Sequence, residues 1–245
     1  MRLKVVACDV LARSVYMSAA TSPHVIDLTL EPYGLHLEPQ KLREKLQEHI
    51  DSVPSNTDYD AFVLAYGLCG KAADGLRAGA VPLVMPRAHD CITLFLGGRA
   101  RYAHEFNTCP GTYWYVKDFI ERSEVEGVPL SIGANTAAEE ETIYAEYVAK
   151  FGADNADYLM KVMHTWQDHY ERAAFIDLGI GDSGFAAELA QTDAGRHGWR
   201  FEQLAGDMVL VKRLLDGDWG EEDFLVVQPG QWVEMVGGDD IISTR

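Results

Sequence analysis

Short apolar runs alternate with amphipathic segments along most of the chain. Apolar runs bounded by Gly, Pro or Asp predict buried strands, and apolar residues at helical spacing predict helices. We predict strands at 3–11, 24–30, 60–70, 80–86, 173–180, 200–206 and 223–231. We predict helices over 39–53, within 91–106, over 185–194 and over 208–217. Strands that alternate with helices are typical of an α/β protein with a mostly parallel sheet.

Residues 136–172 have a different pattern. Thr136 and Glu139 have the spacing of a capping box, and two stretches with apolar residues at helical spacing follow them. Gly152 separates these stretches. The block therefore predicts a pair of helices that bridges the parts of the chain on either side of it.

The two halves of the chain show similar short motifs. "KVVACDVL" is similar to "RAAFIDLG", and "YDAFVLAYGLCG" is similar to "EDFLVVQPGQW". We therefore expect two Rossmann-like lobes with mostly parallel sheets that face a shared cleft, bridged by the helical pair. The expected boundaries are 1–135 for the N-terminal lobe, 136–172 for the bridging helices and 173–245 for the C-terminal lobe. Ligands of open parallel sheets bind beyond the carboxyl ends of the strands, so a small-molecule ligand is expected in this cleft.

Composition and charge narrow the range of partners. The 245 residues include 21 basic and 38 acidic ones, which gives a net charge of −17 and argues against nucleic acid or an anionic membrane as a partner. No apolar run reaches the roughly 20 residues that cross a bilayer. The N-terminus has the pattern of a strand and not of a signal peptide, so a cytoplasmic location is expected. The four cysteines are then expected to be thiols or ligands and not disulfides.

Sulfur and imidazole side chains follow three of the predicted strands. Cys8 ends the first strand, Cys69 follows the third, and His89 and Cys91 follow the fourth. Thiolate and imidazole are the ligands that zinc prefers, so Cys8, Cys69, His89 and Cys91 are candidate ligands of zinc or of an iron–sulfur cluster. Cys91 also opens a predicted helix, whose dipole is expected to lower the pKa of its thiol. The alternative for Cys8 is a small buried apolar residue.

Other residues near these cysteines are candidates for supporting roles. Arg87 and Asp90 are expected to orient His89 or to contact an anionic substrate, so the candidate catalytic group is Cys91, His89, Arg87 and Asp90. Gly67 and Gly70, on either side of Cys69 in "YGLCGK", are candidate cofactor-binding residues. His36 can reach the same edge, but local hydrogen bonds at a helix entry are the favoured interpretation. Cys109 lies in a Pro-Gly loop and is expected to be structural.

A glycine-rich turn in the second half suggests another site. In "IDLGIGDSGFAAELA", Gly179, Gly181 and Gly184 spell G-x-G-x-x-G between a strand and a helix, which is typical of a nucleotide or S-adenosylmethionine loop. Asp177 precedes the loop, and Glu202 lies at a distance suited to a ribose hydroxyl. Asp182 would place negative charge beside a pyrophosphate. A tight turn that lets Asp177 face the cleft is therefore the favoured interpretation.

Several motifs together resemble one known family. "YGLCG", "PRAHDCITLFLG" with its following "PGTYW", and "GDWGEEDFLVVQPG" are similar to the domain of unknown function family numbered 1638, over almost the whole chain. Members of that family tend to occur in anaerobic microbes, often encoded near corrinoid-dependent methyltransferases. The resemblance implies a role in corrinoid-linked one-carbon metabolism, with a corrinoid as a cofactor and a corrinoid protein or methyltransferase as a partner. It supplies no catalytic residues.

These observations lead to one main functional expectation and two alternatives. Zinc enzymes that move a methyl group from a corrinoid to a thiol resemble this chain in having a His-x-Cys pair and a distant Cys. We therefore expect a Cys/His metal- or metallocofactor-binding protein, acting in methyl transfer to a metal-activated thiol. One alternative is a non-catalytic module that binds a corrinoid or metallocofactor, or acts as a chaperone for a methyltransferase. The other is an S-adenosylmethionine- or nucleotide-dependent enzyme that uses the 179–184 loop.

Overall fold

A computed structural model of the chain describes two compact units. The described residues are 1–69, 71–122, 144–145, 148, 152–153, 156, 170–236 and 240–245. Residues 1–102 and 206–245 form the first unit, and residues 103–205 form the second. The expected lobe 173–245 coincides with neither unit, because its last forty or so residues belong to the first one.

The first unit is built on a five-stranded sheet. Its strands are β1 (Arg2–Cys8), β2 (Val25–Glu31), β3 (Ala61–Ala65), β4 (Leu83–Pro86) and β8 (Phe224–Val227). Their order in the sheet is β2-β1-β3-β4-β8. The first four strands are parallel, and β8 is antiparallel to β4. Every residue of β3 and β4 is buried, which agrees with their unbroken apolar sequence. The prediction of an α/β protein with a mostly parallel sheet is thus confirmed.

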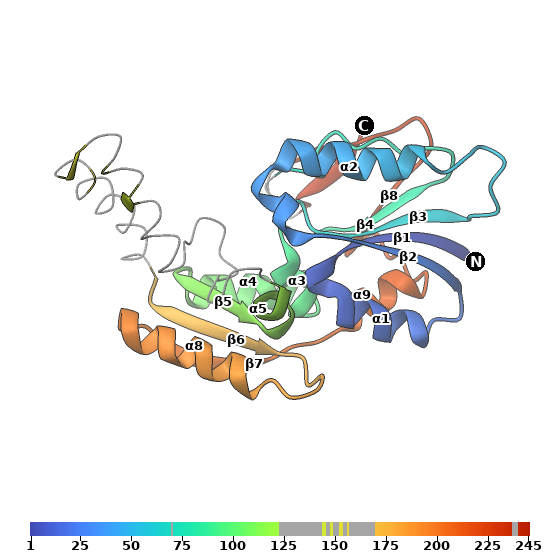
Figure 1. Ribbon diagram of the computed structural model, residues 1–245. Coiled ribbons are helices and arrows are strands. Elements are labelled where there is room, and N and C mark those ends of the chain that lie inside the picture. The colour runs from blue at the N-terminus through green and yellow to red at the C-terminus, as the bar shows by residue number, and fades with distance from the viewer. Residues whose placement is uncertain are drawn as a thin grey trace. The chain divides into compact units, whose positions relative to one another are not determined.

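Helices cover both faces of this sheet. The α-helices of the first unit are α1 (Ala12–Ala20), α2 (Pro39–Asp51), α3 (Cys91–Phe95), α9 (Val209–Leu215) and the start of α4 (Arg99–Thr108), and the 3₁₀ helices are η1 (Asp9–Leu11) and η2 (Tyr33–Leu37). Figure 1 shows α2 over one face of the sheet and α1 and α9 over the other. In α2, Leu42, Leu46 and Ile50 recur every four residues and form its buried side. The sequence did not predict α1, because Ser14 and Ser18 interrupt its buried side.

The second unit is a smaller α/β assembly. It contains the parallel strands β5 (Thr112–Val116), β6 (Arg172–Asp177) and β7 (Arg200–Ala205), together with most of α4 and with α5 (Lys117–Arg122) and α8 (Gly184–His197). Helix α8 packs its alanines against aromatic residues of the sheet, among them Tyr113 and Phe175. Alanines at a spacing of four residues let the helix backbone approach the sheet closely. The strands and the helix predicted between residues 173 and 206 are confirmed.

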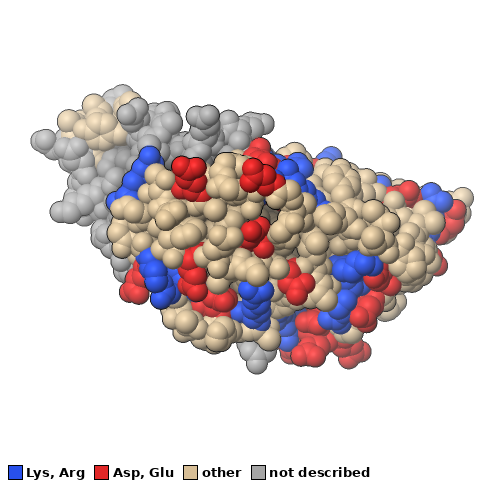
Figure 2. All heavy atoms as spheres, turned by 90° about the horizontal axis from the view of Figure 1, so that it is seen from below, with Lys and Arg blue, Asp and Glu red and all other residues tan. Residues whose placement is uncertain are grey.

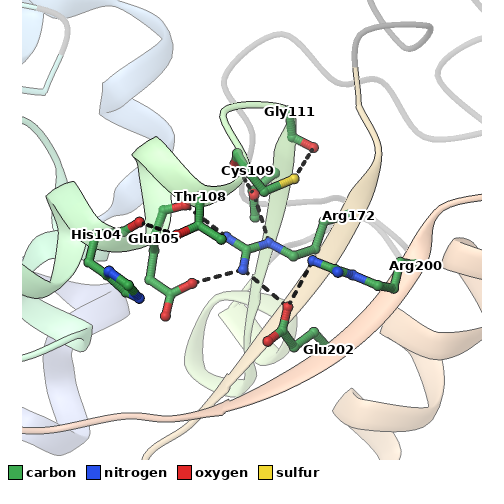
Figure 3. Close-up of polar contacts among 9 residues, drawn as sticks. His104, Glu105, Thr108, Cys109, Gly111, Arg172, Arg200 and Glu202 are labelled. Carbon is green, nitrogen blue, oxygen red and sulfur yellow. Dashed lines mark hydrogen bonds and ion pairs between the residues drawn. The ribbon is translucent and has the colours of Figure 1, made fainter.

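A buried arginine holds the second unit together. Arg172 is only 1% exposed, and Figure 3 shows its guanidinium group between Glu105 and Glu202. Its Nη1 atom lies 2.8 Å from Glu105 Oε2 and 3.1 Å from Glu202 Oε2, and its Nε atom donates to Thr112 Oγ1 at 2.8 Å. Removing one partner from such a buried charge cluster is costly, because the remaining charge is left without compensation.

The C-terminal segment does not repeat the N-terminal one. The motif at 59–70 contains β3, an interior parallel strand, whereas the similar motif at 222–232 contains β8, an antiparallel strand at the edge of the same sheet. A hairpin of β9 (Val233–Met235) and β10 (Ile242–Thr244) follows β8. The interpretation of this second pair of motifs as a repeat between two lobes is therefore wrong.

The bridging block at 136–172 lies largely outside the described residues. Residues 144–145, 148, 153 and 156, which the structure does describe there, are helical. Among the described residues, no helix combines the length and apolar character that a membrane crossing requires.

Candidate functional site

The carboxyl ends of β1, β3 and β4 lie side by side, as predicted. Ala7 pairs with Ala65 in parallel register, so Cys8 at the end of β1 and Tyr66 after β3 emerge at the same edge of the sheet. Strand β4 is the next neighbour of β3, and residues 87–91 follow it at this edge. Three segments that are distant in sequence therefore deliver their side chains to one place. We call the edge formed by Cys8, Tyr66, Cys69 and Cys91 the thiol edge.

The loops that follow β3 and β4 run against each other. Leu68 N donates to Ala88 O at 2.8 Å, and Cys69 N donates to His89 O at 3.1 Å. A Cβ atom on Gly67 would lie 2.7 Å from Asp90 Cα, so only glycine permits this close approach. Gly67 is thus a packing residue of the site, and its predicted cofactor contact has no support in these interactions. Gly70, the other predicted cofactor-binding glycine of this loop, lies outside the described residues.

Cys69 has an unusual backbone conformation. Its φ angle is 46°, in the left-handed region that costs a non-glycine residue about 1 kcal/mol. Strain of this kind persists where the surrounding structure imposes it, and here the bond to His89 O and the burial of the thiol do so. The side chain of Cys69 is therefore held in place at a cost in backbone energy.

The pKa values of two thiols of this edge, Cys69 and Cys91, are raised. Burial, followed by the charge of Asp90, raises the pKa of the Cys69 thiol to about 12. Burial also raises the pKa of Cys91 well above its usual value, with further increases from Asp90, Cys69 and Cys8. The prediction that the helix start lowers the pKa of Cys91 is wrong, because α3 has only five residues and burial outweighs its dipole. In this structure both thiols are neutral at pH 7.

His36 is the imidazole that contacts a thiol. Its Nε2 atom lies 3.5 Å from Cys8 Sγ, and its ring centroid lies 5.8 Å from that of Tyr66. Burial lowers the pKa of His36 to about 4, so the ring is neutral at pH 7. The favoured sequence interpretation, local hydrogen bonds at a helix entry, missed this contact. The available signal was that β2 ends five residues before His36 and pairs with β1, so His36 follows a strand to the same edge.

His89 is placed differently from the prediction. It is exposed, and its ring lies 6.3 Å from that of Tyr102. Its neighbour Asp90 caps α3, with Ile92 N donating to Asp90 Oδ1 at 3.0 Å, and Tyr102 Oη donates to Asp90 Oδ2 at 3.5 Å. Burial raises the pKa of Asp90 despite those bonds. His89 is therefore exposed, whereas the carboxylate of Asp90 is held at the start of α3 by its hydrogen bonds.

Arg87 ties the C-terminal segment to the sheet. Its Nε atom donates to Glu221 O at 2.9 Å and to Phe224 O at 3.3 Å, and its Nη1 atom donates to Asp240 O and Ile242 O. The guanidinium group of Arg87 therefore donates its hydrogen bonds to backbone carbonyl groups of the C-terminal segment. Arg87 was predicted to orient His89 or to contact an anionic substrate. Its contacts show neither role.

The thiol edge is not arranged as a formed metal site. Within the described ranges, no group of three or more His, Cys, Asp or Glu side chains has the arrangement that holds a metal ion. The side chains of Cys8, Cys69 and Cys91, in the positions seen here, therefore do not form such a group. Cys109, by contrast, is buried in the second unit, where its thiol lies 3.9 Å from Gly111 O (Figure 3). It takes no part in the thiol edge.

The glycine-rich loop of the second unit forms a tight turn. Gly179 and Gly181 have φ angles of 66° and 64°. Asp177 Oδ1 accepts hydrogen bonds from Gly179 N at 2.9 Å and Ser183 Oγ at 3.2 Å. Gly184 N donates to Asp182 Oδ1 at 2.9 Å. Two backbone N–H groups of the kind that bind a pyrophosphate are thus occupied by carboxylates, which favours the interpretation as a turn.

A small pocket lies beside this turn. Its lining residues come from the carboxyl ends of β5 and β6, from the start of α5 and from the loop: Val116, Lys117, Asp118, Ile176, Asp177, Leu178, Ile180 and Ser183. Glu202, the predicted ribose contact, is instead engaged by Arg172 and by Arg200. The residues of the G-x-G-x-x-G motif therefore shape a polar pocket, while the expected partner of a ribose is bound elsewhere.

Acidic and basic side chains are mixed on the surface shown in Figure 2. No single basic patch dominates that face.

Comparisons with known proteins give one match. No curated protein and no solved structure matches the chain. A family model described as "Protein of unknown function (DUF1638)" matches residues 30–215, which include His36, Cys69 and Cys91. The matched range covers about three quarters of the 245 residues. This chain therefore belongs to the DUF1638 family.

Proposed function

We propose that the thiol edge of the first unit binds a thiophilic metal ion or metallocofactor, such as zinc or an iron–sulfur cluster, in corrinoid-linked one-carbon metabolism. The observation that carries this proposal is the convergence of Cys8, Cys69 and Cys91 at the carboxyl edge of one parallel sheet. Sulfur ligands select soft and borderline metals over the hard cations that prefer oxygen.

The electrostatic surroundings favour a cation. Asp90 raises the pKa of Cys69 and Cys91, and Glu31 and Asp9 are among the groups that raise the pKa of Tyr66. Burial is the largest cause of these increases, and the further increases named here come from nearby acidic side chains. A positively charged ligand is therefore attracted to the thiol edge, whereas an anionic one is repelled.

The proposed ligand set differs from the one expected from sequence. Cys8, Cys69 and Cys91 remain the sulfur ligands, and His36 replaces His89 as the imidazole. His36 is neutral at pH 7, which is the form that binds metals. The chemistry that a bound metal supplies there is the conversion of a neutral thiol into a thiolate nucleophile.

Metal analysis of anaerobically purified protein tests the proposal. The wild type should carry metal, or take up one equivalent of Zn²⁺ or Co²⁺, and both Cys69→Ser and Cys91→Ser should lose it. Cys109→Ser is the matched control, because Cys109 is also a buried thiol but lies in the second unit. His36→Ala should lower the affinity, whereas His89→Ala should leave it unchanged.

Two results would contradict this assignment. Metal content that survives both Cys69→Ser and Cys91→Ser removes the thiol edge as the site. Loss of metal in His89→Ala but not in His36→Ala restores the original ligand set. A visible spectrum of the same samples separates the candidates, because corrinoids and iron–sulfur clusters are coloured and zinc is colourless.

Methyl transfer to a metal-activated thiol stays a prediction beyond metal binding. It requires that a methylated corrinoid lose its methyl group when the loaded protein and a thiol substrate are added, with the methylated thiol as product. A non-catalytic binding or chaperone role predicts capture of the corrinoid protein or methyltransferase without that product. Two Rossmann-like lobes that face a shared cleft are likewise still a prediction.

Nucleotide or S-adenosylmethionine binding at 179–184 is the remaining alternative. The bonds of Asp177 and Asp182 to Gly179 N and Gly184 N argue against it. Calorimetric titration with either ligand, before and after Gly181→Val, tests it directly.

A further inference from the structure

Strand β2 forms an open edge of the five-stranded sheet. All seven of its residues pair with β1, and no described strand lies on its other side. Val25 N donates to Met1 O, and successive residues of a strand turn their backbone groups to opposite sides. The backbone N–H and C=O groups of Ile26, Leu28 and Leu30 therefore point away from the sheet, and no described residue is hydrogen-bonded to them.

The sequence of β2 does not protect this edge. Edge strands of natural proteins are commonly protected by a proline, a lysine or a bulge, each of which prevents another strand from pairing with them. The strand VIDLTLE has no proline or lysine, and its register with β1 is unbroken. The side chains of Ile26, Leu28 and Leu30 lie on one face of the strand, and each is only partly buried. Such an edge is suited to pairing with another strand.

The charges of β2 fit a second copy of the same strand in one register. A two-fold axis between two copies makes their β2 strands antiparallel. Three registers overlap most of the strand and bring the outward backbone groups together. The register centred on Asp27 places that residue opposite itself, and the register centred on Thr29 places Asp27 opposite Glu31. Only the register centred on Leu28 places Asp27 opposite Thr29 and so avoids facing acids, which destabilise a strand pair.

We infer that this protein forms a two-fold dimer in which β2 pairs antiparallel with β2 of a second copy, centred on Leu28. Ile26 then lies opposite the partner's Leu30, and each such pair exchanges two backbone hydrogen bonds. The apolar side chains of this face cover one another across the two-fold axis, and the two sheets become continuous. This inference goes beyond the proposed function and does not depend on any ligand at the thiol edge.

Sedimentation velocity of the full chain at several concentrations tests the inference, because dimerisation depends on concentration. The wild type should reach twice the monomer mass. Leu28→Pro should stay monomeric, because it removes an outward N–H group that pairing with β1 does not use. Thr29→Asp should raise the dissociation constant about tenfold, because it places two pairs of facing acids in the interface. Lys4 Nζ lies 3.2 Å from Thr29 Oγ1, so the new carboxylate has a cation beside it in the monomer.

The matched control is Thr244→Asp. It makes the same substitution and adds the same charge in β10, a strand of a different sheet. Its dissociation constant should equal that of the wild type.

Amide hydrogen exchange gives an independent measurement. In dilute monomer, exchange along β2 should be slow at the residues whose N–H groups bond to β1 and fast at Ile26, Leu28 and Leu30. At concentrations that favour the dimer, all of these amides should exchange slowly. In Leu28→Pro, Ile26 and Leu30 should exchange fast at every concentration.

Three results would overturn the inference. The first is a wild type that stays monomeric at every concentration. The second is a dimer that persists in Leu28→Pro or whose dissociation constant is unchanged in Thr29→Asp; if Leu28→Pro does not fold, Thr29→Asp alone decides. The third is slow exchange at Leu28 in the monomer, which would show that another part of the chain covers this edge.

Discussion

Substitution of Gly67 by alanine is the most direct test of how the thiol edge is built. The new methyl carbon would lie 2.7 Å from Asp90 Cα, 2.8 Å from Asp90 N and 2.9 Å from Asp90 C. All three are backbone atoms, so no side-chain rotation relieves the contact. Since carbon atoms prefer separations of about 3.5–4.0 Å, the two loops must move apart by roughly 1 Å.

The free energy of this movement follows from the contacts that it breaks. Leu68 N to Ala88 O would lengthen from 2.8 Å, and Cys69 N to His89 O from 3.1 Å, beyond hydrogen-bonding distance. Each bond contributes about 1 kcal/mol, and a steric clash in a packed region costs a further 1–3 kcal/mol. We therefore expect Gly67→Ala to lower the free energy of unfolding by about 3–5 kcal/mol, which corresponds to a melting temperature roughly 6–20 °C lower.

Thermal unfolding followed by circular dichroism measures this change. Gly98→Ala is the matched control, because Gly98 belongs to the same unit and a Cβ atom there would meet nothing within 4 Å. The same samples should show weaker Co²⁺ binding in Gly67→Ala, since Cys69 and Cys91 are displaced. Equal melting temperatures for Gly67→Ala and Gly98→Ala would refute the argument that the two loops can pack this closely only with glycine at position 67.

Two further predictions concern buried ionisable groups. Arg172→Ala should destabilise the protein by about 3–5 kcal/mol in urea unfolding, because it leaves the Glu105 carboxylate half-buried and without its cation; an effect below about 1 kcal/mol would contradict this. For His36, burial lowers the pKa to about 4 from 6.5, so between these values the unfolded chain binds a proton that the folded protein does not. Stability is therefore full above pH 6.5 and should fall by up to about 3 kcal/mol as the pH drops toward 4. His36→Gln should flatten this dependence between pH 7 and 4.5, and an unchanged slope would show that His36 does not cause it.

The sequence predicted the local structure well where packing is simple. Unbroken apolar runs identified β3 and β4, because strands covered on both faces need apolar side chains at every position. The spacing of Leu42, Leu46 and Ile50 identified α2. Helix α1 was missed because Ser14 and Ser18 are buried in it, and β8 was assigned to a separate lobe because a short motif cannot specify its partner strand.

For the candidate site, the sequence predicted which residues lie at the edge of the sheet better than it predicted where their side chains point. Strand-end positions placed Cys8, Cys69 and Cys91 at one edge, since parallel strands share the edge at which they end. The same reasoning favoured His89, yet the turn after β4 directs that ring outward, and His36 faces Cys8 instead. Side-chain direction in a loop depends on contacts with other segments, which sequence spacing does not encode.

The sequence by itself thus determined the α/β class, the parallel strands and the supply of thiols at their ends, because these follow from local apolar patterns and from chain order. Only the tertiary structure decided that Gly67 lets two loops meet and that His36 is the imidazole beside Cys8. It also decided that Arg87 holds the C-terminal segment. The physical reason is that hydrogen-bond partners, burial and pKa values depend on segments far apart in sequence, which come together only when the chain has folded.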